Sequence, residues 1–239
     1  MREAHEKGRS VEATIYTDGT YLARNASWHA EDSPWKARQI ERILARNGLT
    51  PASVCEVGCG AGDVLKQLSR ALPGATFDGY EVSPQAFELC RGREDERVHY
   101  HLKDLLAEEA CFDCLLCIDV IEHVEDYLGF LKALKPKARH KVFHIPLDIS
   151  ALSVLRGSML ELRRRIGHIH YFTPETALAA LRDCGYEIVD SCFTTPFDGL
   201  ASPTVKSRLA RVPRRILFSI SPTWTARLTG GCSLLVLAR

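Results

Sequence analysis

Short apolar runs of strand length alternate along the chain with longer segments in which apolar residues recur at helical spacing. The strands are expected at 53–57, 76–81, 98–102, 112–118, 141–145, 187–194 and 233–238. The helices are expected at 35–47, 63–72, 84–91, 126–134 and 174–184. Such an alternation is typical of a parallel sheet whose connections are helices. The pattern therefore predicts an α/β protein with seven strands.

Two stretches fit no strand–helix unit. Residues 1–34 combine aromatic side chains with acids, and we interpret them as a lid packed over the edge of the sheet. Residues 196–231 form an insertion of four pieces broken at prolines, with a short basic amphipathic helix at 205–211. The predicted organisation is a single domain, with its core at 35–195 and its last strand at 232–239.

Length and composition are those of an ordinary globular protein. The chain has 239 residues, 46% hydrophobic and 26% charged, enough for one large domain or two small ones. This composition excludes a disordered tail, a collagen-like chain and a small disulfide scaffold. The net charge of +1 gives the whole molecule no field that would attract nucleic acid or a membrane. Residues 199–239 nevertheless carry seven basic residues and no acid.

The sequence offers no signal for export. The first ten residues are charged and lack the apolar core of a secretory signal, and no uncharged apolar run approaches a membrane span. We therefore expect a cytoplasmic protein, with its nine cysteines as reduced thiols. Cys111, Cys114 and Cys117 have the spacing of a metal cluster. We reject a cluster because Cys114 and Cys117 would lie on opposite faces of a strand.

The strongest chemical signal lies at 54–63, where a predicted strand runs into three glycines and then into a helix. Gly58, Gly60 and Gly62 allow the backbone to turn tightly and a ligand to lie against bare main chain. A dinucleotide-binding fingerprint would need a further glycine at position 63, where this chain has Asp63. This difference disfavours a hydride-transfer cofactor.

Residues 56–62, with the pattern E-x-G-x-G-x-G, resemble motif I of class I S-adenosylmethionine-dependent methyltransferases. Glu81 ends the second strand where that family has a carboxylate for the two ribose hydroxyls. Asp104 follows the third strand at the family's adenine-binding position. Residues 119–123 are similar to the D-x-x-E-H segment of the branch that contains small-molecule and quinone O-methyltransferases.

The resemblance implies a Rossmann-like, seven-stranded, mostly parallel sheet with helices on both faces, an N-terminal lid and a helical insertion before the last strand. It implies S-adenosyl-L-methionine as cofactor and S-adenosyl-L-homocysteine as product. The cofactor-binding residues that it implies are Glu56, Gly58, Cys59, Gly60, Gly62, Glu81, Val82, Asp104, Leu105, Asp119 and Val120.

Three histidines are candidates for a general base: His123, His168 and His170. His123 is open to two interpretations, because it can act as a base or can fix its loop together with Glu122. His168 and His170 precede a predicted helix, where the family usually builds its acceptor pocket. As a pair they offer too few ligands for a closed metal site, so no metal is predicted.

The acceptor is expected to bind between the lid and the ends of the central strands. The candidate residues are Tyr21, Trp28, His29, His144 and Tyr171. The aromatic lid residues can stack on the acceptor or can seal the core. Lys36 can reach the carboxylate of the cofactor or can lie in water on a helix face.

These observations predict methyl transfer from S-adenosylmethionine to an oxygen or nitrogen of a small-molecule acceptor. One alternative is the same chemistry at a membrane surface on a lipid-like or quinone-precursor acceptor, suggested by the acid-free insertion. The other interpretation of that insertion is a helical cap with its arginines in water, and membrane contact is not favoured. A second alternative is a non-catalytic S-adenosylmethionine-binding protein. No nucleic-acid partner is expected, and the oligomeric state is not predicted.

Overall fold

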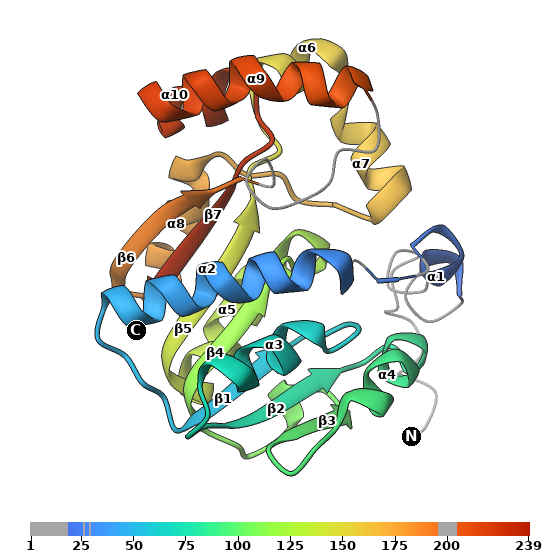
Figure 1. Ribbon diagram of the computed structural model, residues 1–239, viewed down its shortest axis with the longest axis vertical. Coiled ribbons are helices and arrows are strands. Elements are labelled where there is room, and N and C mark those ends of the chain that lie inside the picture. The colour runs from blue at the N-terminus through green and yellow to red at the C-terminus, as the bar shows by residue number, and fades with distance from the viewer. Residues whose placement is uncertain (1–18, 26, 29, 196–204) are drawn as a thin grey trace, which may run out of the picture.

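The computed structural model describes residues 19–25, 27, 28, 30–195 and 205–239, with the backbone alone at residues 20, 24 and 205–211. Its strands form one sheet in the order β3-β2-β1-β4-β5-β7-β6 (Figure 1). They are β1 Ser53–Val57, β2 Thr76–Glu81, β3 Val98–Leu102, β4 Phe112–Ile118, β5 Ala138–Pro146, β6 Ile188–Thr194 and β7 Ser233–Ala238. Because β7 alone runs antiparallel to its neighbours, the predicted mostly parallel, seven-stranded sheet is confirmed.

Helices cover both faces of the sheet. They are α1 Thr20–Arg24, α2 Ser33–Arg46, α3 Asp63–Ala71, α4 Pro84–Cys90, α5 Tyr127–Leu134, α6 Ala151–Arg156, α7 Met159–Ile166, α8 Pro174–Asp183, α9 Val205–Ile220 and α10 Pro222–Leu228. In Figure 1, α2 and α3 cross in front of the sheet and α8 lies behind it. Because β1 to β5 run parallel, their carboxyl ends meet at one edge of the sheet, where ligands of open α/β sheets bind.

Two apolar cores lie on opposite faces of the sheet. Ile40 of α2, Leu65 of α3 and Phe77 of β2 belong to one core, and Leu131 of α5 and Leu181 of α8 belong to the other. All five side chains are fully buried. The central strands β1, β4 and β7 are therefore buried on both faces, which explains why they read as nearly continuous apolar runs in the sequence.

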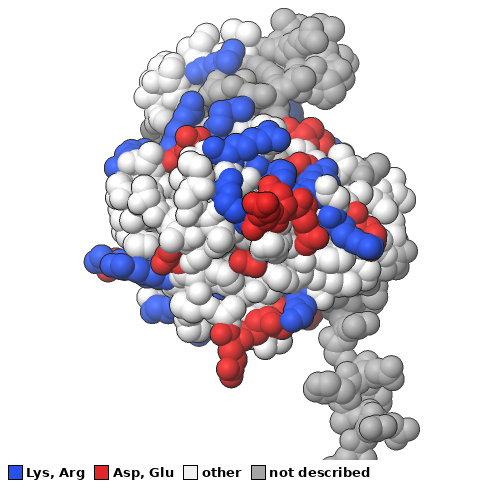
Figure 2. Space-filling view, turned by 60° about the horizontal axis from the view of Figure 1, so that its bottom comes forward, with Lys and Arg blue, Asp and Glu red and all other residues white. Residues whose placement is uncertain are grey.

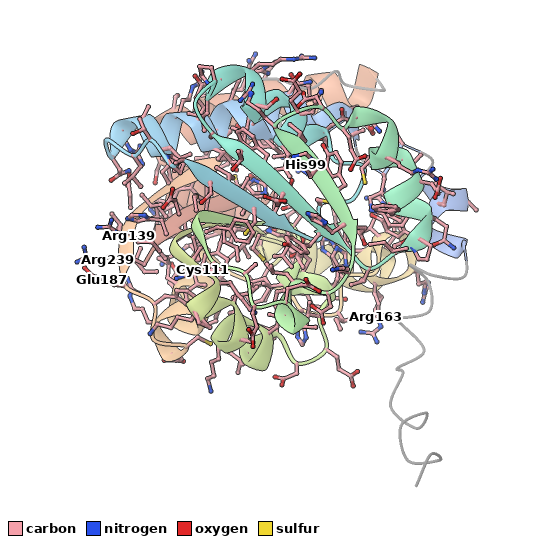
Figure 3. All side chains as sticks on the ribbon, turned by 90° about the horizontal axis from the view of Figure 1, so that it is seen from below. His99, Cys111, Arg139, Arg163, Glu187 and Arg239 are labelled. Atoms are coloured by element: carbon pink, nitrogen blue, oxygen red, sulfur yellow. The ribbon has the colours of Figure 1, made fainter. Side chains whose placement is uncertain are left out.

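The cysteine run at 111–117 is divided between these environments. Cys114 packs in the core beside α2 and α3, Cys117 packs in the core beside α5 and α8, and Cys111 is exposed before β4 (Figure 3). All nine cysteines are free thiols. Burial raises the pKa of the Cys114 thiol to about 12, which keeps it protonated and unreactive.

The expectation that prolines break the insertion was wrong within α9. This helix runs from Val205 to Ile220 with Pro213 inside it. Pro213 is exposed, so the carbonyl that loses its helical hydrogen bond there can bind water instead. The short helix expected at 205–211 is the first part of this longer one. The lid expectation at 1–34 falls largely on residues outside the described ranges.

The charges on the face turned forward in Figure 2 are mixed. Basic and acidic side chains lie beside one another over the described part of this face. Two ion pairs join helices to neighbouring loops around β2 and β3: Lys66–Asp95 and Arg93–Asp63, with N–O distances of 2.6 and 2.9 Å. Opposite charges at this spacing leave this half of the molecule without a continuous basic surface.

Candidate active site

The loop between β1 and α3 presents bare backbone. Gly58, Gly60 and Gly62 have φ of +66°, +55° and +78°, a region that other residues rarely adopt. A Cβ on Gly60 would lie 2.8 Å from Cδ1 of Trp28, and one on Gly62 would lie 2.6 Å from the ring of Tyr100. Glycine is therefore required here by conformation and by space together.

Glu81 at the end of β2 is tied to that loop. Its Oε2 accepts a hydrogen bond from the Gly60 N–H at 2.8 Å, and its Oε1 accepts from the N–H groups of Val82 and Ser83 at 2.9 and 2.8 Å. Burial raises the pKa of Glu81, and these backbone donors oppose the rise. Since a carboxylate offers about four lone pairs, one on Oε2 is left for a ligand.

A cavity of about 640 Å³ opens at the carboxyl edge of the sheet. Its walls come from the glycine loop, from Glu81 and Val82, from the segment after β4, and from Tyr21 and Trp28 of the N-terminal part. The Tyr21 and Trp28 rings contact each other with centroids 4.7 Å apart. This volume lies within the usual range of small-molecule and cofactor sites.

Asp119, directly after β4, is the centre of a charged network. Its carboxylate lies 2.8 Å from Nζ of Lys36 and accepts a hydrogen bond of 2.6 Å from Nδ1 of His144. His144 Nε2 lies 2.9 Å from the hydroxyl of Thr194. Burial alone would raise the pKa of Asp119, but His144 and Lys36 outweigh it and hold that pKa well below its usual range. Asp119 is therefore an anion with two fixed partners.

Two buried carboxyls lie in the wall without a hydrogen-bond partner among the described residues. They are Glu56 on β1, through its Oε2, and Glu122 on the turn after β4, through both oxygens. Burial raises the pKa of both far above the usual range; Lys36 opposes the rise at Glu56, and the charge of Asp119 adds to it at Glu122. A ligand that supplies the missing hydrogen-bond partner would stabilise such buried carboxyls the most.

Two histidines face Glu122. Nε2 of His123 lies 3.9 Å and Nε2 of His168 lies 4.0 Å from Oε1 of Glu122, and the two rings contact edge to face with centroids 4.9 Å apart. Ligand atoms of these three residues lie within 4.8 Å of one another, which is close enough to hold one cation. The pair considered from sequence, His168 with His170, does not share this geometry.

The two histidines differ in their other ring nitrogen. His123 Nδ1 donates to the carbonyl of Gly167 at 3.0 Å, whereas His168 Nδ1 lies 2.6 Å from Oδ2 of Asp148. Burial, followed by the nearby charge of His168, lowers the pKa of His123 to about 4. A carboxylate behind an imidazole fixes its tautomer and stabilises its protonated form. His168 is therefore the better placed proton acceptor.

Comparisons with known proteins agree with this arrangement. A family model described as a methyltransferase domain matches residues 28–191. The chain is 34% identical over 192 residues to the ubiquinone biosynthesis O-methyltransferase of Xylella fastidiosa, covering 71% of this chain and 77% of that protein. It is 29% identical over 187 residues to the protein of the same name from Xanthomonas axonopodis pv. citri, covering 68% and 77%.

The chain belongs to the class I S-adenosylmethionine-dependent methyltransferases. Its fold is that of magnesium protoporphyrin IX methyltransferase from Synechocystis, solved with bound S-adenosylhomocysteine: the TM-score is 0.64 at 16% identity, covering 95% of this chain and 98% of that one. The N-methyltransferase NodS of Bradyrhizobium japonicum gives a TM-score of 0.56 at 18% identity, covering 93% and 98%. The predicted family and the predicted cofactor, S-adenosylmethionine, are thereby confirmed.

Most of the methyltransferase's predicted cofactor residues line the cavity. These are Glu56, Gly58, Cys59, Gly60, Gly62, Glu81, Val82, Asp119 and Val120. Asp104 and Leu105 do not contribute to the described wall. The Asp104 carboxylate accepts a hydrogen bond from the N–H of Leu106 at 2.9 Å, and Leu105 is fully buried in the core. For all eleven residues, the contact with the cofactor itself stays a prediction.

The predicted general-base and acceptor-binding residues separate into two groups. Tyr21, Trp28, His123 and His168 line the cavity, whereas His144, His170 and Tyr171 lie outside its described wall. Both ring nitrogens of His144 face Asp119 and Thr194. His170 Nε2 lies 3.1 Å from the carbonyl of Glu125, and the Tyr171 hydroxyl donates to the carbonyl of Met159. His29 lies outside the described residues.

Sequence reasoning missed Asp148 and left the partner of Lys36 open. Asp148 follows β5 just as Asp119 follows β4, so its place after a parallel strand was the signal that could have identified it. Lys36 is neither a solvated lysine nor without a partner, because it pairs with Asp119. Among the described residues, no helix is both long enough and apolar enough to cross a membrane.

Proposed function

We propose that this methyltransferase transfers the methyl group of S-adenosylmethionine to a hydroxyl oxygen of a small molecule bound beside His168. The observation that carries the proposal is the His168–Asp148 pair in the wall of the cavity that also holds the glycine loop. Nitrogen is the other acceptor atom that this chemistry permits. Oxygen is favoured because the relatives that match two thirds of the chain are O-methyltransferases.

The described residues fit the cofactor. When bound, S-adenosylmethionine supplies a methyl group activated by a sulfonium leaving group. We assign its ribose to Glu81, where one lone pair of Oε2 is left, and its methionine part to the glycine loop near Glu56 and Asp119. The unpartnered Oε2 of Glu56 supports the assignment, because the ammonium of the cofactor can supply the missing donor.

The chain's own residues then handle the acceptor proton. In the neutral tautomer set by Asp148, His168 carries its proton on Nδ1 and leaves Nε2 as the acceptor. As the acceptor oxygen bonds to the methyl carbon, its proton passes to His168 Nε2, and Asp148 stabilises the resulting imidazolium. Tyr21 and Trp28 exclude water and hold the acceptor in line. His123, with its lowered pKa, is the weaker base near neutral pH.

The acceptor is expected to be uncharged or cationic. Beyond the cofactor residues, the cavity wall contains the acids Asp32, Glu122 and Glu125. Lys36 in the same wall is paired with Asp119. An anionic acceptor would therefore lose its hydration without gaining a cationic partner from the described wall. A quinone precursor with phenolic hydroxyls fits these conditions, and the relatives' names support that substrate class.

The remaining expectations belong to the same proposal. We place the enzyme in the cytoplasm, a location supported by its nine free cysteines. We retain the division into a lid at 1–34, a core at 35–195, an insertion at 196–231 and a last strand at 232–239. A non-catalytic cofactor-binding protein is the less favoured function, because the His168–Asp148 pair has no purpose in cofactor binding alone.

Single-turnover release of S-adenosylhomocysteine tests the proposal, with a panel of simple catechols and phenols set against matched anilines and benzoates. We expect turnover with the hydroxyl compounds, a strong loss in His168→Gln, and little change in the control His170→Gln. Turnover of anilines alone would reassign the acceptor atom to nitrogen. No turnover by the wild-type protein, despite cofactor binding, would favour the non-catalytic alternative.

A further inference from the structure

The helices α6, α7, α9 and α10, here called the cap, expose unusually many large apolar side chains. Leu155 on α6 is 85% exposed, Ile220 on α9 is 75% exposed and Trp224 on α10 is 54% exposed. Figure 1 shows α6, α9 and α10 together at one end of the molecule with α7 below them, and α10 packs on both α9 and α6. Clustered exposed apolar side chains mark an interaction surface, whereas scattered ones are ordinary.

The exposed residues follow helical spacing. Val212, Ile216 and Ile220 succeed each other at intervals of four along α9, and Trp224 and Leu228 continue the interval along α10. Residues four apart lie on one face of a helix, so each helix presents an apolar stripe to solvent. The inner side of α9 is already occupied, because Phe218 packs against the core beside α5 and α8. The outward stripe therefore leaves between 45% and 75% of each of these five residues exposed in the described chain.

The charge of the cap is one-sided. The four helices contain ten arginines and lysines and one acid, Glu161. Arg156 and Arg165 are exposed next to the apolar residues of α6 and α7. Figure 3 shows Arg163 of α7 pointing away from the sheet, on the opposite side of the molecule from the Glu187–Arg239 ion pair. Apolar side chains flanked by arginine are what an amphipathic helix needs to lie on an anionic bilayer.

We infer that the cap docks this methyltransferase on the anionic surface of a lipid bilayer, with the stripe of α9 and α10 inserted between headgroups. A second copy of the chain fits this surface less well. In a symmetric dimer the same face meets itself, so the arginines of one cap would oppose those of the other. A bilayer carrying negative headgroups supplies the opposite charge over the whole face.

The docked face is connected to the cavity by a single helix. Leu160 near the start of α7 is exposed, whereas Ile166 at its end lines the cavity wall. A cap resting on a bilayer would therefore place the cavity within a helix length of the lipid. The advantage of this arrangement is access to an acceptor dissolved in the membrane, and that part of the inference rests on the proposed function. The docking itself does not depend on the acceptor.

Co-sedimentation with vesicles tests the docking. We expect the wild-type protein to bind vesicles containing phosphatidylglycerol and to bind phosphatidylcholine vesicles weakly, with binding that falls as salt is added. The double variant Ile220→Ser, Trp224→Ser should weaken binding about tenfold or more, because two large side chains no longer leave water. Arg156→Gln with Arg165→Gln should weaken binding and reduce its salt dependence.

Leu128→Ser is the matched control, since Leu128 is an exposed apolar residue on α5, outside the cap, and its loss should leave vesicle binding unchanged. S-adenosylmethionine affinity, measured on each preparation, separates a docking defect from misfolding and from failure of the proposed function. Equal binding to both vesicle types, or none to either, overturns the inference. It is also overturned if the cap variants abolish a dimer seen by sedimentation velocity while vesicle binding stays unchanged.

Discussion

Nδ1 of His168 and Oδ2 of Asp148 lie 2.6 Å apart, with both side chains largely buried beside the cavity. Asp148→Asn keeps the shape of the side chain but removes its charge, so the imidazolium formed during transfer loses its stabilising partner. We expect kcat to fall about 100-fold, as is usual when a general base is impaired. The dissociation constant of S-adenosylmethionine, measured by calorimetry, should stay within about twofold.

A merely structural role of Asp148 would give a different result. In that case Asp148→Asn would lower the melting temperature and cofactor affinity together, and the pH dependence of kcat would keep its wild-type shape. If Asp148 acts through His168, the acidic limb of the kcat profile should move in Asp148→Asn and be absent from His168→Gln.

The pairing of Lys36 with Asp119 should contribute to stability. Lys36→Met retains the apolar stem but leaves Asp119 with His144 as its remaining partner, in a site that is mostly shielded from water. We expect a loss of about 2 kcal/mol in the free energy of unfolding, measured in urea. Lys66→Met is the matched control, since Asp95 is 41% exposed in its side chain, and should cost clearly less than Lys36→Met. Equal costs would contradict this account.

Alanine substitutions at Gly60 and Gly48 separate the effect of a steric clash from the effect of backbone strain. Both have positive φ, +55° and +66°, but a Cβ on Gly60 meets Trp28 whereas one on Gly48 meets nothing within 4 Å. Each alanine substitution should cost about 1 kcal/mol of stability from backbone strain. Gly60→Ala should in addition weaken S-adenosylmethionine binding about tenfold or more. Unchanged cofactor affinity in Gly60→Ala would show that this loop is not the binding surface.

Glu122 should make the protein less stable as the pH rises. Its raised pKa means that the folded state retains a proton that the unfolded chain releases above about pH 4.3. The wild-type protein therefore loses stability above that pH through Glu122, and Glu122→Gln lacks this contribution. We expect the melting temperature of Glu122→Gln to exceed that of the wild type by more at about pH 8 than at about pH 5, with a chelator present.

The exposed Glu109 provides the control for that comparison, because Glu109→Gln should give the same small difference from the wild type at both pH values. A Glu122→Gln protein that is less stable than the wild type at the higher pH would show that the carboxylate is ionised and has a partner in the folded protein.

The sheet could be predicted from the sequence because its central strands, such as β1, β4 and β7, are buried on both faces. The bounds of β1 at Ser53–Val57, β2 at Thr76–Glu81 and β4 at Phe112–Ile118 are the expected ones, since apolar runs between polar turns define them locally. The bounds of β5 were too short by several residues. Its first residues, including Arg139 and His140, are polar and do not continue the apolar pattern.

The short helices α6 and α7 were not predicted. They have six and eight residues, which is too short for helical periodicity to be recognised in a sequence. The outward stripe of α9 and α10 was equally hidden, because exposed and buried apolar residues look alike in a sequence. Which face of these helices meets water is decided by packing.

In the site, residues within motifs could be predicted and their partners could not. Glu81 and Asp119 follow strands at positions that local pattern identifies. The pairs Lys36–Asp119 and His168–Asp148 join residues 83 and 20 positions apart, and tertiary structure alone brings them together. His144 illustrates the same limit. It follows the pattern of a strand end, yet its ring faces Asp119 and Thr194.

Calorimetric titration of the purified protein with S-adenosylmethionine, S-adenosylhomocysteine and NAD tests the central claim most directly. The cavity beside Gly60 and Glu81 should bind the first two and not NAD. Glu81→Ala, which removes the lone pair assigned to the ribose, should weaken both about tenfold or more. Binding of NAD, or S-adenosylmethionine binding that is indifferent to Glu81→Ala, would contradict the account.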